Sequence, residues 1–185
     1  MIEAELKARL ADVDAVRAAL MKRATPESAT YWDTYYDTPG EELDRAGREL
    51  RLRTVEAGSV RRHLLTFKEP AIDEASSSKP EYETTVGDPD AVDHLVRALG
   101  LHVLIRLTKD CENYRFAEAG RVLLATVVRV PEIDGTFLEV ETMAEEQDVG
   151  PALTVVRRVL ADLGVTEGEL TTELYTDAVR TARRG

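Results

Sequence analysis

Short segments throughout the chain alternate apolar and polar residues, which is the pattern of a β-strand that buries one face. The run RELRLRTV at 48–55 is typical, because leucines alternate there with Arg51 and Arg53. The strand candidates are nine segments, at residues 2–8, 31–37, 48–55, 62–68, 81–86, 103–109, 111–117, 121–130 and 136–142. The sequence therefore predicts a strand-rich core.

Four further segments place apolar residues three and four positions apart, the spacing of an amphipathic helix. These segments are residues 13–23, 89–99, 150–163 and 172–183. Asp12 is suited to cap the first helix, and Gly100 and Gly164 follow the second and third as helix stops. We expect these helices to pack their apolar faces against the strands.

Composition indicates one globular domain over residues 1–185, with 43% hydrophobic and 32% charged residues. No apolar run approaches the roughly 20 residues needed to span a bilayer, and no signal-peptide pattern opens the chain. Cys111 has no second cysteine with which to form an internal disulfide, which fits a reducing compartment. We therefore expect a cytoplasmic protein, either a monomer or a homodimer, without a membrane partner.

The net charge of −11 argues against a nucleic-acid partner, because such binding requires a basic surface. An acidic exterior can still enclose a basic pocket, so the distribution of charge matters more than its sum. Acidic pairs occupy alternate positions at Glu3 and Glu5, Glu81 and Glu83, and Glu139 and Glu141. Basic residues share this spacing at Arg51 and Arg53 and occur singly at Lys7, Lys68, Lys79 and Lys109.

The opposite faces of these strands are apolar, as at Leu6, Leu52 and Val140. If helices cover the apolar faces, the charged faces point inward and the sheet must close around a polar interior. Unpartnered charges lose several kcal/mol each in solvation there, so the arrangement indicates bound ligands. Clustered carboxylates favour Mg²⁺ or Mn²⁺ over zinc, and arginine with lysine suits phosphate oxygens. The pattern predicts a metal-dependent polyphosphate site.

The chain also resembles the CYTH superfamily, the triphosphate tunnel metalloenzymes that include class IV adenylyl cyclases and thiamine triphosphatases. The matching motifs, in order, are ExExK at 3–7, YYDTP at 35–39, LRLR at 50–53, TxK at 66–68, ExE at 81–83, GxFxExE at 135–141 and a tyrosine segment at 174–177. A lone ExExK motif is weak, but this ordered set covers nearly the whole chain.

The resemblance implies an α+β fold, in which a closed tunnel of eight antiparallel strands has a charged interior and helices packed outside. The implied ligands of Mg or Mn are Glu3, Glu5, Glu139 and Glu141, with Glu81 and Glu83 close behind. The implied substrate-binding residues are Lys7, Arg51, Arg53, Lys68, Lys79, Lys109 and Tyr36. The implied catalytic residues are Lys7, Arg53 and Lys68, and Lys7 or a metal-activated hydroxide is the candidate base.

Three departures from the family pattern affect the functional interpretation. Lys79 and Cys111 stand where the family has arginines, and 125–130 lacks an expected aspartate. The leading hypothesis is a metal-dependent hydrolase of inorganic tripolyphosphate, thiamine triphosphate or a nucleoside triphosphate. One alternative is a class IV adenylyl cyclase that makes cyclic AMP and pyrophosphate from ATP. The departures motivate another, a non-catalytic protein that binds triphosphates or nucleotides.

Overall fold

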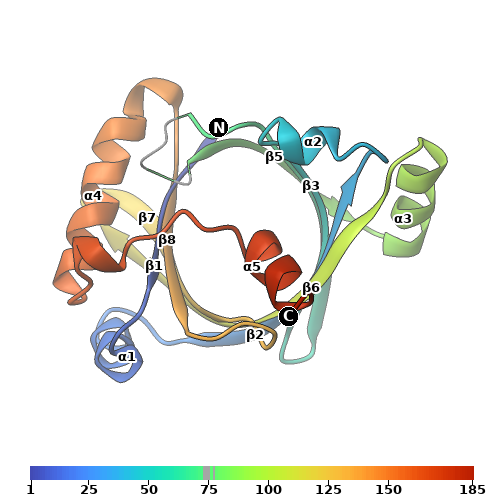
Figure 1. Ribbon diagram of the computed structural model, residues 1–185. Helices are drawn as coiled ribbons and strands as arrows, with labels where there is room; N and C mark the ends of the chain where they lie inside the picture. Colours follow the sequence, from blue (N-terminus) through green and yellow to red (C-terminus); the bar gives the residue numbers. More distant parts are fainter. Residues whose placement is uncertain (73–75, 77) are drawn as a thin grey trace.

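Eight antiparallel strands close into a barrel in the computed structural model, which describes residues 1–72, 76 and 78–185 (Figure 1). The strands are β1 (Ile2–Arg9), β2 (Glu27–Asp37), β3 (Glu49–Ala57), β4 (Val60–Lys68), β5 (Lys79–Val86), β6 (His102–Glu118), β7 (Arg121–Arg129) and β8 (Phe137–Ala144). Their order around the barrel is β1-β5-β4-β3-β2-β6-β7-β8. The eight-stranded closed barrel implied by the resemblance is confirmed.

One strand replaces two of the predicted segments. Residues 103–109 and 111–117 both belong to β6, which runs without interruption for 17 residues. No glycine or proline interrupts this stretch, and Asp110 simply continues the ladder by pairing with Thr30 and Arg129. The prediction of nine strands is therefore wrong in one respect, because it divided β6 into two strands.

Helices lie outside the barrel walls or across one of its ends (Figure 1). They are α1 (Val13–Met21), α2 (Glu42–Arg45), α3 (Pro89–Ala98), α4 (Val149–Asp162) and α5 (Tyr175–Ala182). The four predicted helices are confirmed, and Asp12 caps α1 by accepting a hydrogen bond from the Ala15 amide. Among the described residues, no helix combines the length and the apolar character required to cross a membrane.

The short helix α2 was not predicted, and its anchor is the aspartate of the YYDTP motif. The buried Asp37 carboxylate accepts hydrogen bonds from the backbone amides of Thr38, Leu43 and Asp44, at 2.6, 2.9 and 2.9 Å. This motif residue therefore has a structural role, because it satisfies amides that would otherwise lack partners at the start of a helix.

The hydrophobic core lies between the outer face of the barrel and the helices. On one side, Leu138 and Val140 of β8 pack in one buried cluster with Val156 and Leu160 of α4. On another side, Leu52 of β3 lies in a cluster with residues of α3. The apolar faces therefore point outward, as predicted, and the alternate charged positions point into the barrel.

The barrel closes through an incomplete seam. β1 pairs with β5 only at Ile2–Pro80 and Glu3–Lys79. Farther along β1, the C-terminal segment takes the place of β5, because the Thr171 amide donates a hydrogen bond to the Lys7 carbonyl. This segment then crosses the barrel end and leads into α5 (Figure 1). The C-terminus thus completes the wall and covers one end.

The core assignment predicts that Leu138→Ala lowers the free energy of unfolding by about 2–5 kcal/mol, because it leaves a cavity beneath α4. Urea denaturation followed by circular dichroism measures this loss. The control is Val122→Ala, since Val122 is 61% exposed on the neighbouring strand and its truncation should cost less than about 1 kcal/mol. Equal losses for the two variants would contradict the assignment.

Candidate active site

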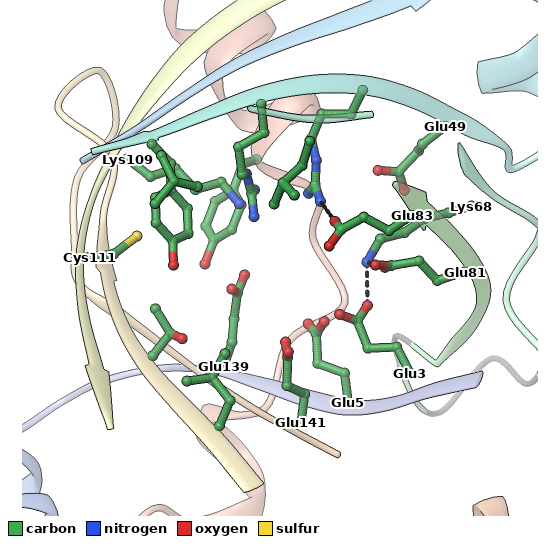
Figure 2. Close-up of a pocket in the computed structure, with 18 of the residues that line it drawn as sticks. Glu3, Glu5, Glu49, Lys68, Glu81, Glu83, Lys109, Cys111, Glu139 and Glu141 are labelled. Atoms are coloured by element: carbon green, nitrogen blue, oxygen red, sulfur yellow. Dashed lines mark hydrogen bonds and ion pairs between the residues drawn. The ribbon is translucent and has the colours of Figure 1, made fainter. Parts of the chain in front are cut away.

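A charged cavity of about 470 Å³ fills the interior of the barrel (Figure 2). Its acidic residues are Glu3, Glu5, Glu49, Glu81, Glu83, Glu139 and Glu141. Its basic residues include Lys7, Arg51, Arg53, Lys68, Lys79 and Lys109. These side chains converge because each occupies the inward-facing position of its strand. All the predicted site residues except Tyr36 therefore line one cavity.

Three carboxylates meet at the β1–β8 wall. Glu5 pairs with Glu141 across the two strands, and oxygens of Glu3, Glu5 and Glu141 lie within 4.8 Å of one another. Burial, followed by the negative charges of Glu139 and Glu3, raises the pKa of Glu5 to about 8. Burial and the charges of Glu3 and Glu5 also raise the pKa of Glu141 well above its usual range. A cation would relieve this repulsion, and an all-oxygen donor set suits Mg²⁺ or Mn²⁺.

The other three predicted metal ligands have different partners. Burial opposes ionisation of Glu139, but the ammonium groups of Lys109 and Lys7 outweigh it and lower its pKa. Glu81 forms an ion pair with Lys68 at 2.8 Å. Glu83 accepts a hydrogen bond from the Thr66 hydroxyl at 2.8 Å. The structure thus brings together three of the six predicted carboxylates.

Two of the cavity lysines are held by carboxylates. Lys68 lies between Glu3 and Glu81. Its desolvation opposes the charged form, but the charges of Glu3 and Glu81 outweigh this effect and raise its pKa well above the usual range. Lys79 forms an ion pair with Glu49, a cavity residue that was not predicted. Glu49 shares the inward alternation of Arg51 on β3, which is the signal that could have identified it.

Arg51 retains free hydrogen-bonding capacity inside the cavity. Its Nη2 donates to the Thr66 hydroxyl at 3.3 Å and lies 4.0 Å from Glu83. Its Nε is buried without a hydrogen-bond partner among the described residues. A buried donor without an acceptor is costly, and a phosphate oxygen would satisfy it.

Arg53 is instead bound by an aspartate that was not predicted. Its Nε and Nη2 donate to the two oxygens of Asp33 at 2.6 and 2.7 Å, and its guanidinium lies 4.5 Å from the Tyr31 ring centroid. Burial opposes ionisation of Asp33, but Arg53 holds the pKa of this carboxyl well below its usual range. The charge of Arg53 is thus already offset, and Asp33 fixes its orientation.

Tyr175 of α5 occupies the closed end of the cavity between two lysines. The Nζ atoms of Lys7 and Lys109 lie 4.6 and 4.2 Å from its ring centroid. The Lys7 ammonium also donates to the Glu173 carbonyl. Burial and the nearby charge of Glu139 raise the pKa of the Tyr175 hydroxyl well above its usual range. The C-terminal segment therefore supplies part of the cavity wall.

The placement of Tyr36 does not fit its predicted contact with the substrate. Its hydroxyl donates a 2.6 Å hydrogen bond to Asp93 of α3, and its ring belongs to the buried cluster with Val96 outside the barrel. Tyr35 lines the cavity instead. Neighbouring residues of a strand point to opposite faces, so only one of the two tyrosines of the motif can face inward.

Two departures from the family pattern, Cys111 and the missing aspartate of 125–130, each remove a charge and lie on neighbouring strands. Cys111 is a buried cavity residue on β6, and burial raises the pKa of its thiol to about 12. β7 carries the segment without the expected aspartate, and Thr126 faces the cavity there. Thr126 donates a hydrogen bond to Asn113, which is also bonded to the Tyr31 hydroxyl. We call Tyr31, Cys111, Asn113 and Thr126 the neutral wall.

Comparisons with known proteins agree with this geometry. The profile of the CYTH domain matches residues 1–175. The adenylate cyclase CyaB of Aeromonas hydrophila is 28% identical over 182 residues, which are 97% of this chain and 87% of that protein.

Several solved structures share the whole fold. The PH1819 protein from Pyrococcus horikoshii OT3 has a TM-score of 0.85 at 25% identity, covering 98% of this chain and 99% of its own. An adenylate cyclase candidate from Vibrio parahaemolyticus has a TM-score of 0.80 at 20% identity, covering 97% and 98%. The adenylyl cyclase candidate HpAC1 from Hippeastrum, described as having a dominant triphosphatase activity, has a TM-score of 0.67 at 17% identity, covering 98% and 96%.

The Asp33–Arg53 pair predicts that Asp33→Asn lowers the free energy of unfolding by about 3–5 kcal/mol at pH 7, because Arg53 would stay buried without its counter-charge. The pKa of Asp33 is lower in the folded protein than in the unfolded chain. The carboxylate therefore stabilises the fold above the ordinary aspartate pKa, and this contribution is lost as the pH falls through the folded value. Urea denaturation at pH 7 and pH 3 should show the difference from wild type shrinking in acid.

The control for this prediction is Asp14→Asn, because the Asp14 side chain is 98% exposed. It should leave the free energy of unfolding nearly unchanged at both pH values. An Asp33→Asn loss of the same size at pH 7 and pH 3 would show that the pair does not act through its charge.

Proposed function

Because the chain belongs to the CYTH domain family, we propose that it is a metal-dependent hydrolase that cleaves a triphosphate inside its barrel. Members of this family are adenylyl cyclases and triphosphatases. The observation that carries the proposal is the opposition, within one cavity, of a three-carboxylate cluster and the incompletely paired cations Arg51 and Lys109. Opposed groups of this kind match a complex of a divalent cation with a polyphosphate.

Glu3, Glu5 and Glu141 are the residues proposed to hold Mg²⁺ or Mn²⁺. Their proximity and the raised pKa values of Glu5 and Glu141 indicate carboxylates that lack enough positive charge around them. A divalent cation held there would supply positive charge to offset the negative charge that develops during transfer. Glu139 faces the same cavity and is a candidate for a further ligand.

The basic residues are proposed to bind the phosphates, to stabilise the transferred group and to accept a proton. Arg51 has an unsatisfied buried Nε. Lys109 lies over the Tyr175 ring and near the charge of Glu139, but its ammonium forms no hydrogen bond or ion pair with the described residues, so both cations can bind phosphate oxygens. Lys68 and Arg53 are positioned by carboxylates and contribute positive potential beside the transferred group. Burial lowers the pKa of Lys7, which fits the role of the group that takes a proton from the attacking water.

Hydrolysis requires only phosphate recognition and a positioned water, and every residue named above serves those two tasks. The Hippeastrum protein shows that this fold can support a dominant triphosphatase activity. The second candidate is an adenylyl cyclase, favoured by the similarity to CyaB over 97% of the chain. A cyclase must in addition orient the ribose 3′-hydroxyl toward the α-phosphorus.

A non-catalytic triphosphate-binding protein is the third hypothesis. Two departures from the family pattern, Cys111 and the aspartate missing from 125–130, weaken it when they are considered together. Cys111 lies on β6, and the segment without the aspartate lies on the adjacent strand β7. The first departure removes a positive charge and the second a negative charge, so together they leave the net charge of this wall unchanged. The carboxylate cluster is intact, and an anion binder would gain little from three clustered carboxylates.

The metal assignment predicts that Glu5→Ala abolishes Mg²⁺-dependent turnover of triphosphates while the fold stays cooperative. Phosphorus NMR with Mg²⁺ and tripolyphosphate, thiamine triphosphate or ATP measures it. Orthophosphate with the matching diphosphate identifies the hydrolase, and pyrophosphate with cyclic AMP identifies the cyclase. Glu145→Ala is the control, because Glu145 is an exposed residue outside the cavity. Near-full turnover by Glu5→Ala would show that this carboxylate does not hold the metal.

The phosphate assignment predicts that Arg51→Ala weakens triphosphate binding by about 1.5–3 kcal/mol, the scale of a hydrogen bond to a charged group. This corresponds to about a 10- to 150-fold increase in Kd, measurable by calorimetry. Arg129→Ala is the matched control, since Arg129 is exposed and does not line the barrel cavity. An unchanged affinity for Arg51→Ala would remove Arg51 from the phosphate site.

A further inference from the structure

Glu49 is a cavity carboxylate that belongs neither to the metal cluster nor to the Asp33–Arg53 pair. It accepts a hydrogen bond from the Lys79 ammonium, and the side chains of Glu49 and Lys79 are only 20% and 10% exposed. Lys79 forms no other hydrogen bond or ion pair with the described residues. Glu49 also lies outside the motifs on which the family resemblance rests. The pair is therefore a feature of the cavity without a role in the proposed function.

The surroundings of Glu49 are cationic. It faces Lys68 across the β3–β4 ladder, and Arg51 is the next inward residue on its own strand. Burial opposes ionisation of Glu49, but the charges of Lys79, Lys68 and Arg51 outweigh this effect and lower the pKa of its carboxyl. Figure 2 shows Glu49 on the side of the cavity that holds Lys68, apart from Glu5 of the metal cluster. The carboxylate therefore occupies a position that suits an anion.

Glu49 lies between Arg51 and the closed end of the cavity. β3 begins at that end, because Arg180 of α5 forms an ion pair with Asp44 of α2, shortly before β3 in the chain. Successive inward positions of a strand are about 6–7 Å apart, so an anion in the place of the Glu49 carboxylate would adjoin an anion bound at Arg51. A phosphate chain that extended past Arg51 toward the closed end would meet this carboxylate, which repels phosphate and already occupies Lys79.

Resting on the proposed function, which places phosphate oxygens at Arg51, we propose that Glu49 is a specificity-determining residue that limits the length of the phosphate chain. Its carboxylate fills a further phosphate subsite, which is formed by Lys79 and bordered by Lys68 and Arg51, and so excludes a fourth phosphate group. Lys79 then contributes little to the binding of a triphosphate, although it lines the cavity. Without the charge of Glu49, Lys79 would bind the additional phosphate of a tetraphosphate.

A purely structural role for the pair predicts a different result. If Glu49 only neutralised Lys79 inside the barrel, its loss would change the free energy of unfolding but not the preference between phosphate chains of different length. In the proposed role, the effect of removing the carboxylate depends on chain length and requires Lys79. Binding of two polyphosphates that differ by one phosphate group therefore distinguishes the two roles.

The test is Glu49→Gln, which removes the charge and keeps the size of the side chain. Calorimetry with tripolyphosphate and tetrapolyphosphate is done in EDTA, so that metal-dependent hydrolysis does not proceed. We expect the Kd for tetrapolyphosphate to fall about tenfold, the scale of one hydrogen bond to a charged group, and that for tripolyphosphate to change less than about threefold. Glu56→Gln is the matched control, because Glu56 of the same strand pairs with the exposed Arg61 and does not line the barrel cavity.

The double variant Glu49→Gln/Lys79→Gln shows whether the gain requires Lys79. We expect its Kd for tetrapolyphosphate to return to within about threefold of wild type. This variant leaves neither charge of the pair without its partner, so it also serves if Glu49→Gln alone does not unfold cooperatively in urea. Its Kd for tripolyphosphate should then stay within about threefold of wild type, whereas a tenfold loss would show that Lys79 binds the triphosphate and would overturn the inference.

Phosphorus NMR of wild type with Mg²⁺ separates this inference from the proposed function. If wild type hydrolyses no triphosphate, the proposed function fails, yet a gain in binding by Glu49→Gln that is confined to tetrapolyphosphate still supports the limit on chain length. Equal gains for the two polyphosphates, no gain for tetrapolyphosphate, or a gain that persists without Lys79 would overturn it.

Discussion

The cost of holding charges inside a closed barrel is the constraint on which the rest of this structure depends. Seven glutamates, four lysines and four arginines line the cavity, and those held inside it would lose solvation without a partner. The interior therefore contains acids and bases close together, as where Lys68 lies between Glu3 and Glu81. Because the polar faces point inward, the apolar faces point outward and require helices such as α3 and α4 as cover.

Within this interior, two kinds of charged group can be distinguished by their partners. Asp33 with Arg53 and Glu49 with Lys79 neutralise one another, so they stabilise the barrel and fix the shape of the cavity. The carboxylates of Glu5 and Glu141 lie beside other acids, and the Nε of Arg51 has no acceptor. Groups left in such unfavourable states are those that a bound ligand would satisfy, which is why they carry the functional argument.

The C-terminal segment makes the two ends of the barrel different. It fills the seam beside β1, and it places Tyr175 over the ammonium groups of Lys7 and Lys109. The end that it covers is buried, while the other end presents Arg62 and Arg115 to solvent. The charged cavity is therefore closed at one end and open to solvent at the other.

The sequence by itself determined which residues face the cavity, because strand alternation is a local property with a period of two residues. Glu3, Glu5 and Lys7 could be placed inward in this way, and the same parity would have found Glu49 and Asp33. Only the tertiary structure decided which inward groups meet, since register and closure join strands distant in the sequence: Glu141 lies against Glu5, whereas Glu139 lies beside the lysines. The position of Tyr175 at the closed end of the cavity also depends on long-range packing, which no local pattern encodes.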